Sequence, residues 1–131
     1  MLYGYSQKNF PLEGLRKAAA RAILKEIKTN PLHRIFVAVT KDNQGLVNAA
    51  TTLFVEPKFI FRGGKVGHIE DLSKGRMPRK GIGFELRSHA TEQAAIMCCV
   101  KTVLDCSDEN APFYQKLGYS YQDNCMKIMH K

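Results

Sequence analysis

The amino-acid sequence predicts an α/β (α+β) domain in which a mixed, mostly antiparallel, twisted sheet is flanked by helices. An amphipathic helix pattern comes first, several short β-forming segments follow it, and a glycine-rich loop leads into a second helix. Helices that pack on a sheet bury the apolar faces of both kinds of element. The length of 131 residues is that of one ordinary domain, so we expect residues 1–131 to share a single core.

The first predicted element is a helix over residues 11–28. Its apolar residues recur every three to four positions, with Arg, Lys and Glu between them; they are Leu12, Leu15, Ala19, Ile23 and Ile27. Pro11 suits the first turn of a helix, because the backbone donor that proline lacks has no partner there. Asn30 and Pro31 end the helix.

Residues 34–39 and 46–55 are predicted to be the strands of an antiparallel hairpin. Both are rich in β-branched and apolar side chains, and the polar turn between them contains a glycine that tolerates positive φ. A third strand is predicted over residues 66–72. It carries an acidic pair, Glu70 and Asp71, near its end.

The C-terminal half is predicted to form a helix over residues 84–97 and a strand over residues 99–106. A brief helix follows over residues 110–117, with Gly118 as its cap. Residues 119–131 are predicted to be a final strand. No repeat, low-complexity tract or linker interrupts this order of elements.

The chain is basic, with a formal net charge of +8 from 20 Lys and Arg against 12 Asp and Glu. Such a charge attracts nucleic acid, phosphorylated metabolites and the pyrophosphate of coenzyme A alike. The basic residues are scattered and lack the interleaved aromatic side chains of a single-strand binder. The charge thus indicates a phosphate-bearing partner of a kind that composition does not identify. With the resemblance described below, we expect a small molecule as the partner, and neither a nucleic acid nor a membrane.

The cysteines Cys98, Cys99, Cys106 and Cys125 form no CxxC pair and no spacing with histidine that holds zinc. We expect free, buried thiols in a reducing compartment, and no metal. The chain has neither a membrane-length apolar stretch nor a signal-peptide pattern, so a cytoplasmic location is expected. His68 and His89 have no motif context and are expected to be structural.

A phosphate-binding loop is predicted where the third strand leads into the second helix. The segment reads Arg79-Lys80-Gly81-Ile82-Gly83. Free backbone N–H groups and the positive end of the helix dipole meet there and attract phosphate oxygens. Glycines let a ligand approach the backbone, and the flanking Arg and Lys add charge. For these residues alone, an ordinary loop remains the more common explanation.

This loop resembles the acetyl-CoA loop of the GNAT superfamily, which reads Q/R-x-x-G-x-G/A between a central strand and a helix. Here the leading position is occupied by Pro78, with Arg76 and Arg79 close to it. A more specific resemblance, to the glucosamine-6-phosphate N-acetyltransferases, runs from Phe36 to the C-terminus. It implies a GNAT-type sheet, with a shortened N-terminus in this chain.

Three blocks carry that second resemblance. The first is EPKFIF at residues 56–61, followed by GHIED at residues 67–71, and the second is the glycine loop. The third, LDCSDENAPFYQKLGY at residues 104–119, resembles the family pattern L-D/E-C-x-x-x-N-x-x-F-Y-x-K-x-G-Y/F. The chain departs from the family at Phe61, where histidine is expected, and at His130, where arginine is frequent.

The resemblance implies acetyl-CoA as cosubstrate and a set of site residues. The implied catalytic residues are Glu70, Asp71, Asp105 and Tyr114. The implied residues around the cofactor are Glu70, Asp71, Leu72, Ser73, Arg79, Lys80, Gly81, Ile82, Gly83, Asn110, Phe113 and Tyr114. The implied residues around the substrate are Lys58, Phe61, Asp71, Cys98, Cys99, Asp105 and His130.

The chemistry of these groups suits acetyl transfer to an amine. A carboxylate, here Glu70, accepts the ammonium proton while other carboxylates orient the acceptor. The Tyr114 hydroxyl is expected to donate a proton to the departing sulfur. Backbone N–H groups near Leu72 are expected to polarise the thioester carbonyl, a contribution of about 3 kcal/mol per well-placed donor.

The resemblance thus implies transfer of acetyl to glucosamine 6-phosphate, giving the N-acetyl sugar phosphate that is used for UDP-N-acetylglucosamine, by a homodimer. Two alternatives stay open at this point. One is a GNAT enzyme for another amine, such as a protein terminus, a lysine or a small amine. The other is a non-catalytic basic module, or a nucleic-acid binder that uses residues 76–80. Strongly salt-dependent DNA binding without affinity for acetyl-CoA would favour it.

Overall fold

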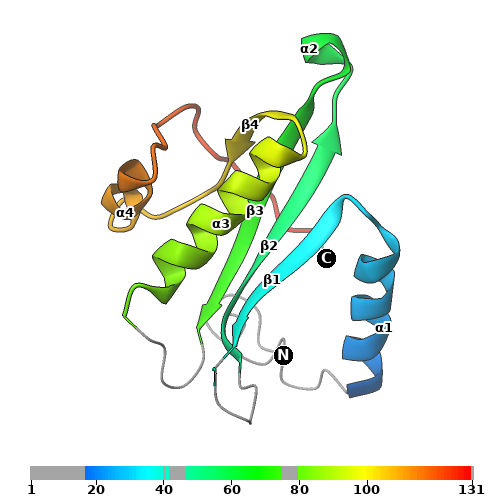
Figure 1. Ribbon diagram of the computed structural model, residues 1–131. Helices are drawn as coiled ribbons and strands as arrows, with labels where there is room; N and C mark the ends of the chain where they lie inside the picture. The colour runs from blue at the N-terminus through cyan, green and yellow to red at the C-terminus, as the bar shows by residue number, and fades with distance from the viewer. Residues whose placement is uncertain (1–16, 40, 42–46, 75–79, 131) are drawn as a thin grey trace.

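The computed structural model of the chain describes residues 17–39, 41, 47–74 and 80–130. The elements follow one another as α1 (Lys17–Thr29), β1 (His33–Val39), β2 (Val47–Pro57), α2 (Ile60–Gly63), β3 (Lys65–Lys74), α3 (Ile82–Ile96), β4 (Cys99–Val103) and α4 (Ala111–Lys116). Figure 1 shows the strands as one central sheet with helices around it.

The four strands lie in the order β1-β2-β3-β4. The first two pairs are antiparallel, while β3 and β4 run parallel. A parallel pair needs a crossover connection, and α3 provides it. The predicted mixed, mostly antiparallel sheet is therefore confirmed.

Helix α3 covers one face of the sheet and forms the core with it. Leu53, Val55 and Ile69 are almost completely buried there against Ala90 and Ala94. These alanines let the helix approach closely. A Cβ on Gly67 of β3 would lie 3.1 Å from the Ala94 Cβ, so any larger residue here would press the helix away from the strand by a few tenths of an ångström. A second cluster, of Ala49, Ile82 and Leu86, closes the other end of the interface.

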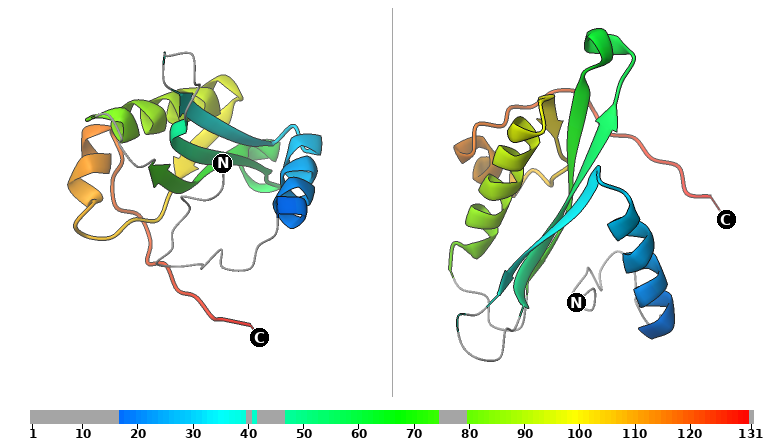
Figure 2. Two further views of the ribbon diagram at one scale, coloured as in Figure 1. Left: turned by 90° about the horizontal axis from the view of Figure 1, so that it is seen from below. Right: turned by 45° about the vertical axis from the view of Figure 1, so that its right-hand side comes forward.

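Helix α1 lies on the opposite face of the sheet, as the two views of Figure 2 show. Its Ile23 and Ile27 face side chains that alternate with the buried core positions of β2 and β3. Alternation along a strand sends successive side chains to opposite faces. The α1 side of the sheet is consequently less tightly packed than the α3 side, and a groove lies there between the helix and the strands.

Most element boundaries lie close to the predicted ones. The first helix ends at Thr29, while residues 11–16 lie outside the described part of the chain. Helix α3 begins at Ile82, two residues earlier than predicted. The strand predicted over residues 99–106 ends at Val103. Gly118 follows α4 with a φ of +97°, the left-handed conformation expected of a helix-ending glycine.

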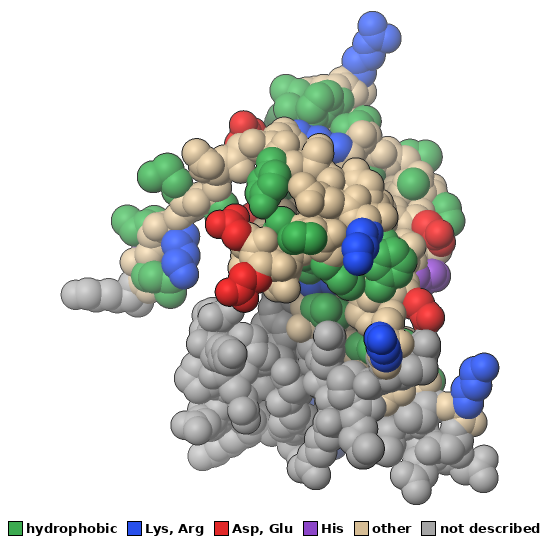
Figure 3. All heavy atoms as spheres, turned by 90° about the vertical axis from the view of Figure 1, so that its left-hand side faces the viewer, with side chains coloured by type: hydrophobic (Ala, Val, Ile, Leu, Met, Phe, Trp, Pro, Cys, Tyr) green, Lys and Arg blue, Asp and Glu red, His purple; other side chains and the backbone are tan. Residues whose placement is uncertain are grey.

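The prediction of a strand over residues 119–131 is wrong. Residues 119–130 contain no strand, and the segment leaves the body of the protein with exposed apolar side chains (Figure 3). Tyr121, Met126 and Ile128 are 69%, 92% and 78% exposed. A strand needs a hydrogen-bonded neighbour, and in the described part of this chain no strand pairs with the segment.

The cysteines are free, as expected, but the expectation that they are buried is wrong. Cys98, Cys106 and Cys125 are exposed, and Cys99 is half-buried. They lie at strand ends and in loops, beyond the apolar stretches.

In the described ranges, no three His, Cys, Asp or Glu side chains are placed to hold a metal ion. No helix of residues 17–39, 47–74 and 80–130 has the length and apolar character needed to span a membrane.

Candidate active site

The start of α3 has the features of a phosphate site. Gly81 precedes the helix as its N-cap residue with a φ of +83° and, as a glycine, has no side chain to cap the first turn. A Cβ added to Gly81 would meet nothing within 4 Å, so the space above it is open. Ile82 and Gly83 are buried beneath this entrance, Lys80 is exposed beside it, and Arg79 lies outside the described residues. A first turn without a cap presents N–H groups to an anion.

Helix α4 lies beside this helix start. The rings of Phe84 in α3 and Phe113 in α4 meet edge to face, with centroids 5.7 Å apart. Tyr114 is 7% exposed, and the Arg87 guanidinium of α3 lies 5.5 Å from its ring centroid. Asn110 precedes α4 as its N-cap residue. Predicted cofactor residues from two helices are therefore brought to one side of the sheet.

Strands β3 and β4 part beyond His68 and Val103. These two residues are the last registered pair of the parallel ladder, while β3 continues to Lys74. The described backbone of β3 has no strand partner on that side from Ile69 onward. Glu70 on β3 and Asp105 after β4 each lie two residues beyond the last pair. The two predicted acids thus stand at matching positions where the strands separate.

A β-bulge at Asp71 interrupts the pairing of β3 with β2. Thr51 is paired with Leu72 and Thr52 with Glu70, so Asp71 is the extra residue. A bulge leaves backbone groups unpaired and changes the direction of neighbouring side chains. Leu72 packs against the second core cluster. The side chains of Asp71 and Ser73 lie outside the described part of the structure.

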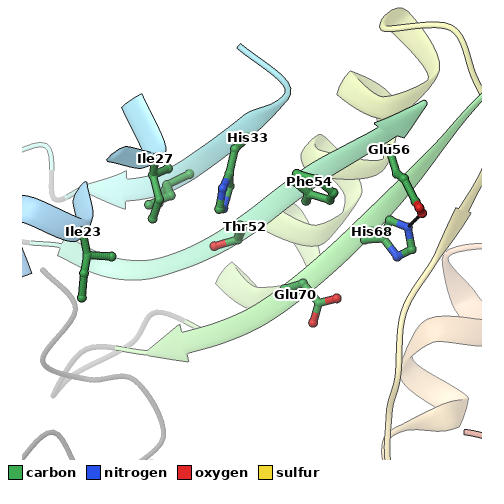
Figure 4. Close-up of a pocket in the computed structure, with 9 residues that line it drawn as sticks. Ile23, Ile27, His33, Thr52, Phe54, Glu56, His68 and Glu70 are labelled. Carbon is green, nitrogen blue, oxygen red and sulfur yellow. Dashed lines mark hydrogen bonds and ion pairs between the residues drawn. The ribbon is translucent and has the colours of Figure 1, made fainter. Parts of the chain in front are cut away.

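A groove of about 600 Å³ lies between α1 and the open face of the sheet (Figure 4). Glu70 is exposed at its edge, with Thr52 beside it on the paired strand. At one end, Ile23 and Ile27 of α1 give the groove an apolar wall. At the other end, Glu56 and His68 give it a polar one.

Glu56 is the centre of a small ion network in this groove. Its Oε1 atom accepts a hydrogen bond from the Lys58 ammonium at 3.0 Å and lies 2.9 Å from Nε2 of His68. The hydrogen bond from Lys58, followed by that from His68, lowers the pKa of Glu56 below its usual value. Sequence reasoning missed this link. Its only signal was that Glu56 and His68 lie in the two adjoining motif blocks.

Asp105 and Tyr114 line a second hollow, of about 650 Å³, between β4, α4 and the C-terminal segment. The Asp105 carboxylate accepts a weak hydrogen bond from the Cys125 thiol, with 3.6 Å between Oδ2 and Sγ. Glu70 does not line this hollow. Of the predicted catalytic residues whose side chains are described, Glu70 lines the groove beneath α1, whereas Asp105 and Tyr114 line the second hollow.

Four of the residues predicted around the substrate lie at one end of the sheet: Lys58, Phe61, Cys98 and Cys99. The Lys58 N–H bonds the Gly64 carbonyl, and Cys99 is registered with Lys65. Burial raises the pKa of the Cys99 thiol, an effect that the nearby Lys65 charge opposes. Lys101 stands over the Phe61 ring, 5.6 Å from its centroid. Lys65 and Lys101 add basic groups that sequence reasoning did not single out.

Three residues at this end have left-handed backbone conformations without being glycine. Phe61 and Arg62 have φ values of 56° and 55°, and Cys98 has a φ of 64°. Such conformations cost about 1–2 kcal/mol each for a residue with a side chain. His130 is exposed in the C-terminal segment and makes no described contact with the hairpin end.

Comparison with known proteins identifies similar chains. No family model matches the sequence. A Candida albicans glucosamine 6-phosphate N-acetyltransferase is 45% identical over 82 residues, which are 62% of this chain and 55% of that protein. The Schizosaccharomyces pombe protein of the same name is 39% identical over 75 residues, 56% of this chain and 68% of that one.

A crystal structure of glucosamine-6-phosphate N-acetyltransferase from Arabidopsis thaliana superposes with a TM-score of 0.81 at 28% identity. The superposition covers 90% of this chain and 81% of that one. It confirms the predicted fold class. The chain spans only 55% of the length of the Candida relative that it matches.

Proposed function

This chain belongs to the family of glucosamine 6-phosphate N-acetyltransferases, and on that premise we propose that it transfers acetyl from acetyl-CoA to the amine of glucosamine 6-phosphate. The product is N-acetylglucosamine 6-phosphate, for UDP-N-acetylglucosamine synthesis. The parting of β3 from β4 beyond His68 and Val103 is the observation that carries the proposal. We also propose that residues 1–131 fold as one GNAT domain that works in the cytoplasm.

The parted strands suit an acyl-CoA chain. The pantetheine arm has amide groups, which can bond the backbone of β3 beyond Ile69 as a neighbouring strand would. Its pyrophosphate fits the start of α3, where Gly81 opens the backbone and Lys80 adds charge. Arg79, Ser73 and Leu72 are proposed for the same site. Asn110 and Phe113 of α4 are proposed to border the arm.

The residues that line the opening supply the chemistry. Glu70 accepts a proton from the substrate ammonium, and Asp105, at the matching position after β4, orients the sugar together with Asp71. The amine nitrogen then bonds the carbonyl carbon as the carbon–sulfur bond breaks. Tyr114 donates to the sulfur, so that free coenzyme A leaves as a thiol. Unpaired N–H groups at the bulge of β3 stabilise the carbonyl oxygen.

The basic end of the sheet is proposed to hold the sugar phosphate. Lys58, Lys65 and Lys101 lie there with Phe61, Cys98 and Cys99 around them. Ammonium groups bind a phosphate as point charges. A second copy of the chain is proposed to complete the site, with His130 near its phosphate.

The C-terminal segment supports a homodimer. It presents Met126, Ile128 and Met129 to solvent without a strand partner in the described part of its own chain. Pairing with a second copy would bury these side chains and satisfy the backbone. Sedimentation should show a dimer for the full chain and a monomer after removal of residues 121–131. A monomeric full chain would contradict this part of the proposal.

A thiol-release assay tests the function. Acetyl-CoA is offered with glucosamine 6-phosphate, with glucosamine or with a lysine peptide. Release of coenzyme A with the sugar phosphate alone is expected. Release only with the peptide would assign the chain to another amine, and salt-dependent DNA binding without acetyl transfer would make it a binding module.

A further inference from the structure

The groove beneath α1 holds a second titratable group beside Glu70. His68 and Glu70 are two residues apart on β3, ahead of the bulge at Asp71, so both side chains point to the same face. Their Cα atoms are then about 7 Å apart along the strand. Both side chains line the groove, as Figure 4 shows.

The hydrogen bond to Glu56 fixes which ring nitrogen of His68 carries the proton. Glu56 accepts from the Lys58 ammonium through the same oxygen that faces the imidazole. The two hydrogen bonds lower the pKa of Glu56, so its carboxylate is ionised at neutral pH and acts only as an acceptor. Nε2 must therefore be the donor. In the neutral ring, Nδ1 then has a free lone pair.

The described side chains on the other walls of the groove are apolar, apart from His33 of β1 and Thr52 of β2. Helix α1 contributes the apolar Ile23 and Ile27. Strand β1 contributes His33, whose ring packs edge-on against Phe54 with centroids 5.6 Å apart. In the described part of the groove, the acidic side chains are Glu56, which is bound to Lys58, and Glu70. Lys101 and Asp105 lie on the neighbouring segment, two residues to either side of Val103, the strand partner of His68.

We propose that His68, held by Glu56, takes the proton that Glu70 accepts from the substrate ammonium and releases it to solvent. This inference rests on the proposed function and extends it to the proton path. The ammonium loses one proton to Glu70, and Nδ1 of His68 receives it directly or through one water. The nitrogen lone pair forms the new bond to the carbonyl carbon while the carbon–sulfur bond breaks. The amine nitrogen loses a second proton as the amide forms, and this loss is balanced by the proton that the sulfur of coenzyme A gains when it leaves as a thiol.

A histidine suits this position better than a second carboxylate. An ordinary carboxylic acid titrates near pH 4, about two to three units below an imidazole. Proton transfer in catalysis is most effective when the accepting group titrates near the working pH. Because Glu56 balances the charge of the imidazolium, the proton can remain on His68 until solvent removes it.

The variant His68→Gln tests the proposal, because an amide can still donate to Glu56 but cannot accept a proton from Glu70. We expect kcat with glucosamine 6-phosphate to fall by at least about tenfold, within the range of acid–base contributions, with KM and the melting temperature nearly unchanged. The inflection of an imidazole should also disappear from the pH profile of kcat/KM. His89→Gln is the matched control. This histidine is exposed on α3, across the sheet, and packs on Phe36.

Variants of Glu56 separate a proton path from a structural role. Glu56→Gln removes the charge that stabilises the imidazolium, so the inflection should move to lower pH, and Glu56→Asp should partly restore it. Imidazole ¹⁵N shifts of the wild-type protein should show the Nε2–H tautomer of His68 without any turnover. The Nδ1–H tautomer would overturn the proposal. The proposal would also be overturned if the pH profile of kcat/KM were unchanged in His68→Gln, or if this variant lost the same fraction of its rate at every pH.

The wild-type assay keeps the two proposals distinct. Wild-type protein that releases no coenzyme A with glucosamine 6-phosphate would overturn the proposed function, and the proton path with it. Active wild-type protein whose His68→Gln variant keeps full rate and the same pH profile would overturn the proton path alone.

Discussion

Glu70 on β3 and Asp105 in the segment after β4 each lie two residues beyond His68 and Val103, the last registered pair of the parallel ladder. The ladder holds the strands together up to that pair, and α3 joins their opposite ends. Because the hydrogen-bonded pairing of β3 and β4 ends at one defined pair, it fixes the point from which the two segments are no longer joined. In the proposed function the substrate lies at this opening, with Glu70 as the base and Asp105 orienting the sugar.

Glu70→Gln should lower kcat by about 10²- to 10⁴-fold, because the variant cannot accept the ammonium proton. Glu70 is exposed and its loss removes no buried contact, so the melting temperature should stay the same. Steady-state kinetics with glucosamine 6-phosphate measure the effect. Glu92→Gln, at an exposed position of α3, is the control and should behave as wild type. A fully active Glu70→Gln variant would remove this residue as the base.

Gly81→Ala should raise the KM for acetyl-CoA by about tenfold or more, since its Cβ enters the space above the helix start. The left-handed φ of +83° also costs the alanine about 1–2 kcal/mol of stability. Gly63→Ala separates the two effects, because Gly63 has a φ of +78° and the same open surroundings at the hairpin tip. Both variants should melt earlier, but only Gly81→Ala should bind acetyl-CoA more weakly. If Gly81→Ala and Gly63→Ala had the same KM for acetyl-CoA, the proposal that the Gly81 loop binds the cofactor would be refuted.

Tyr114→Phe should reduce kcat and leave the fold intact. The ring stays packed among Phe113, Tyr119 and the Arg87 guanidinium, and only the hydroxyl is lost. If that hydroxyl protonates the leaving sulfur, kcat should fall by about 10²-fold. Thiol release and circular dichroism, measured together, check both parts. Full turnover by the phenylalanine variant would exclude Tyr114 as the donor.

Tyr119 should make the protein lose stability at alkaline pH. Burial raises its pKa above the ordinary value, and its hydroxyl is 2.7 Å from the Thr91 hydroxyl. Because the unfolded chain releases the phenolic proton first, stability is retained below pH 10 or so and falls as the pH rises through the folded-state pKa. Tyr119→Phe should remove this alkaline loss.

The same variant also loses the hydrogen bond to Thr91. Its free energy of unfolding at pH 7 should be lower by about 1 kcal/mol, the net value of one hydrogen bond. Urea denaturation at pH 7 and above pH 10 measures both effects. The same alkaline slope in wild type and variant would show that another group is responsible.

Local pattern was sufficient to predict most of the fold. The apolar spacing of α1 and the β-branched runs of β1 and β2 are visible within short stretches of the sequence. The glycine that precedes α3 can be recognised in the same way. The strand predicted after Tyr119 failed because pairing depends on a neighbour, which local pattern cannot supply. The bulge at Asp71 and the end of the ladder at Val103 were not predictable for the same reason: both depend on register with another strand.

The candidate site was predictable only where residues lie close in the sequence. Motif blocks pointed to Glu70, Asp105 and the Gly81 loop. The link from Lys58 through Glu56 to His68 depends on side chains of two strands that meet across the hairpin. No spacing in the sequence reveals which side chains share a face after a turn of undetermined geometry.

Hydrogen exchange with and without acetyl-CoA is the most direct test of the central claim. Backbone amides at residues 69–72 of β3 and residues 82–85 at the start of α3 should exchange more slowly when acetyl-CoA is bound. Desulfo-coenzyme A, which keeps the pyrophosphate and the pantetheine amides, should protect the same amides. Unchanged exchange in both segments, or protection confined to the groove beneath α1, would contradict an acyl-CoA chain lying between the parted strands.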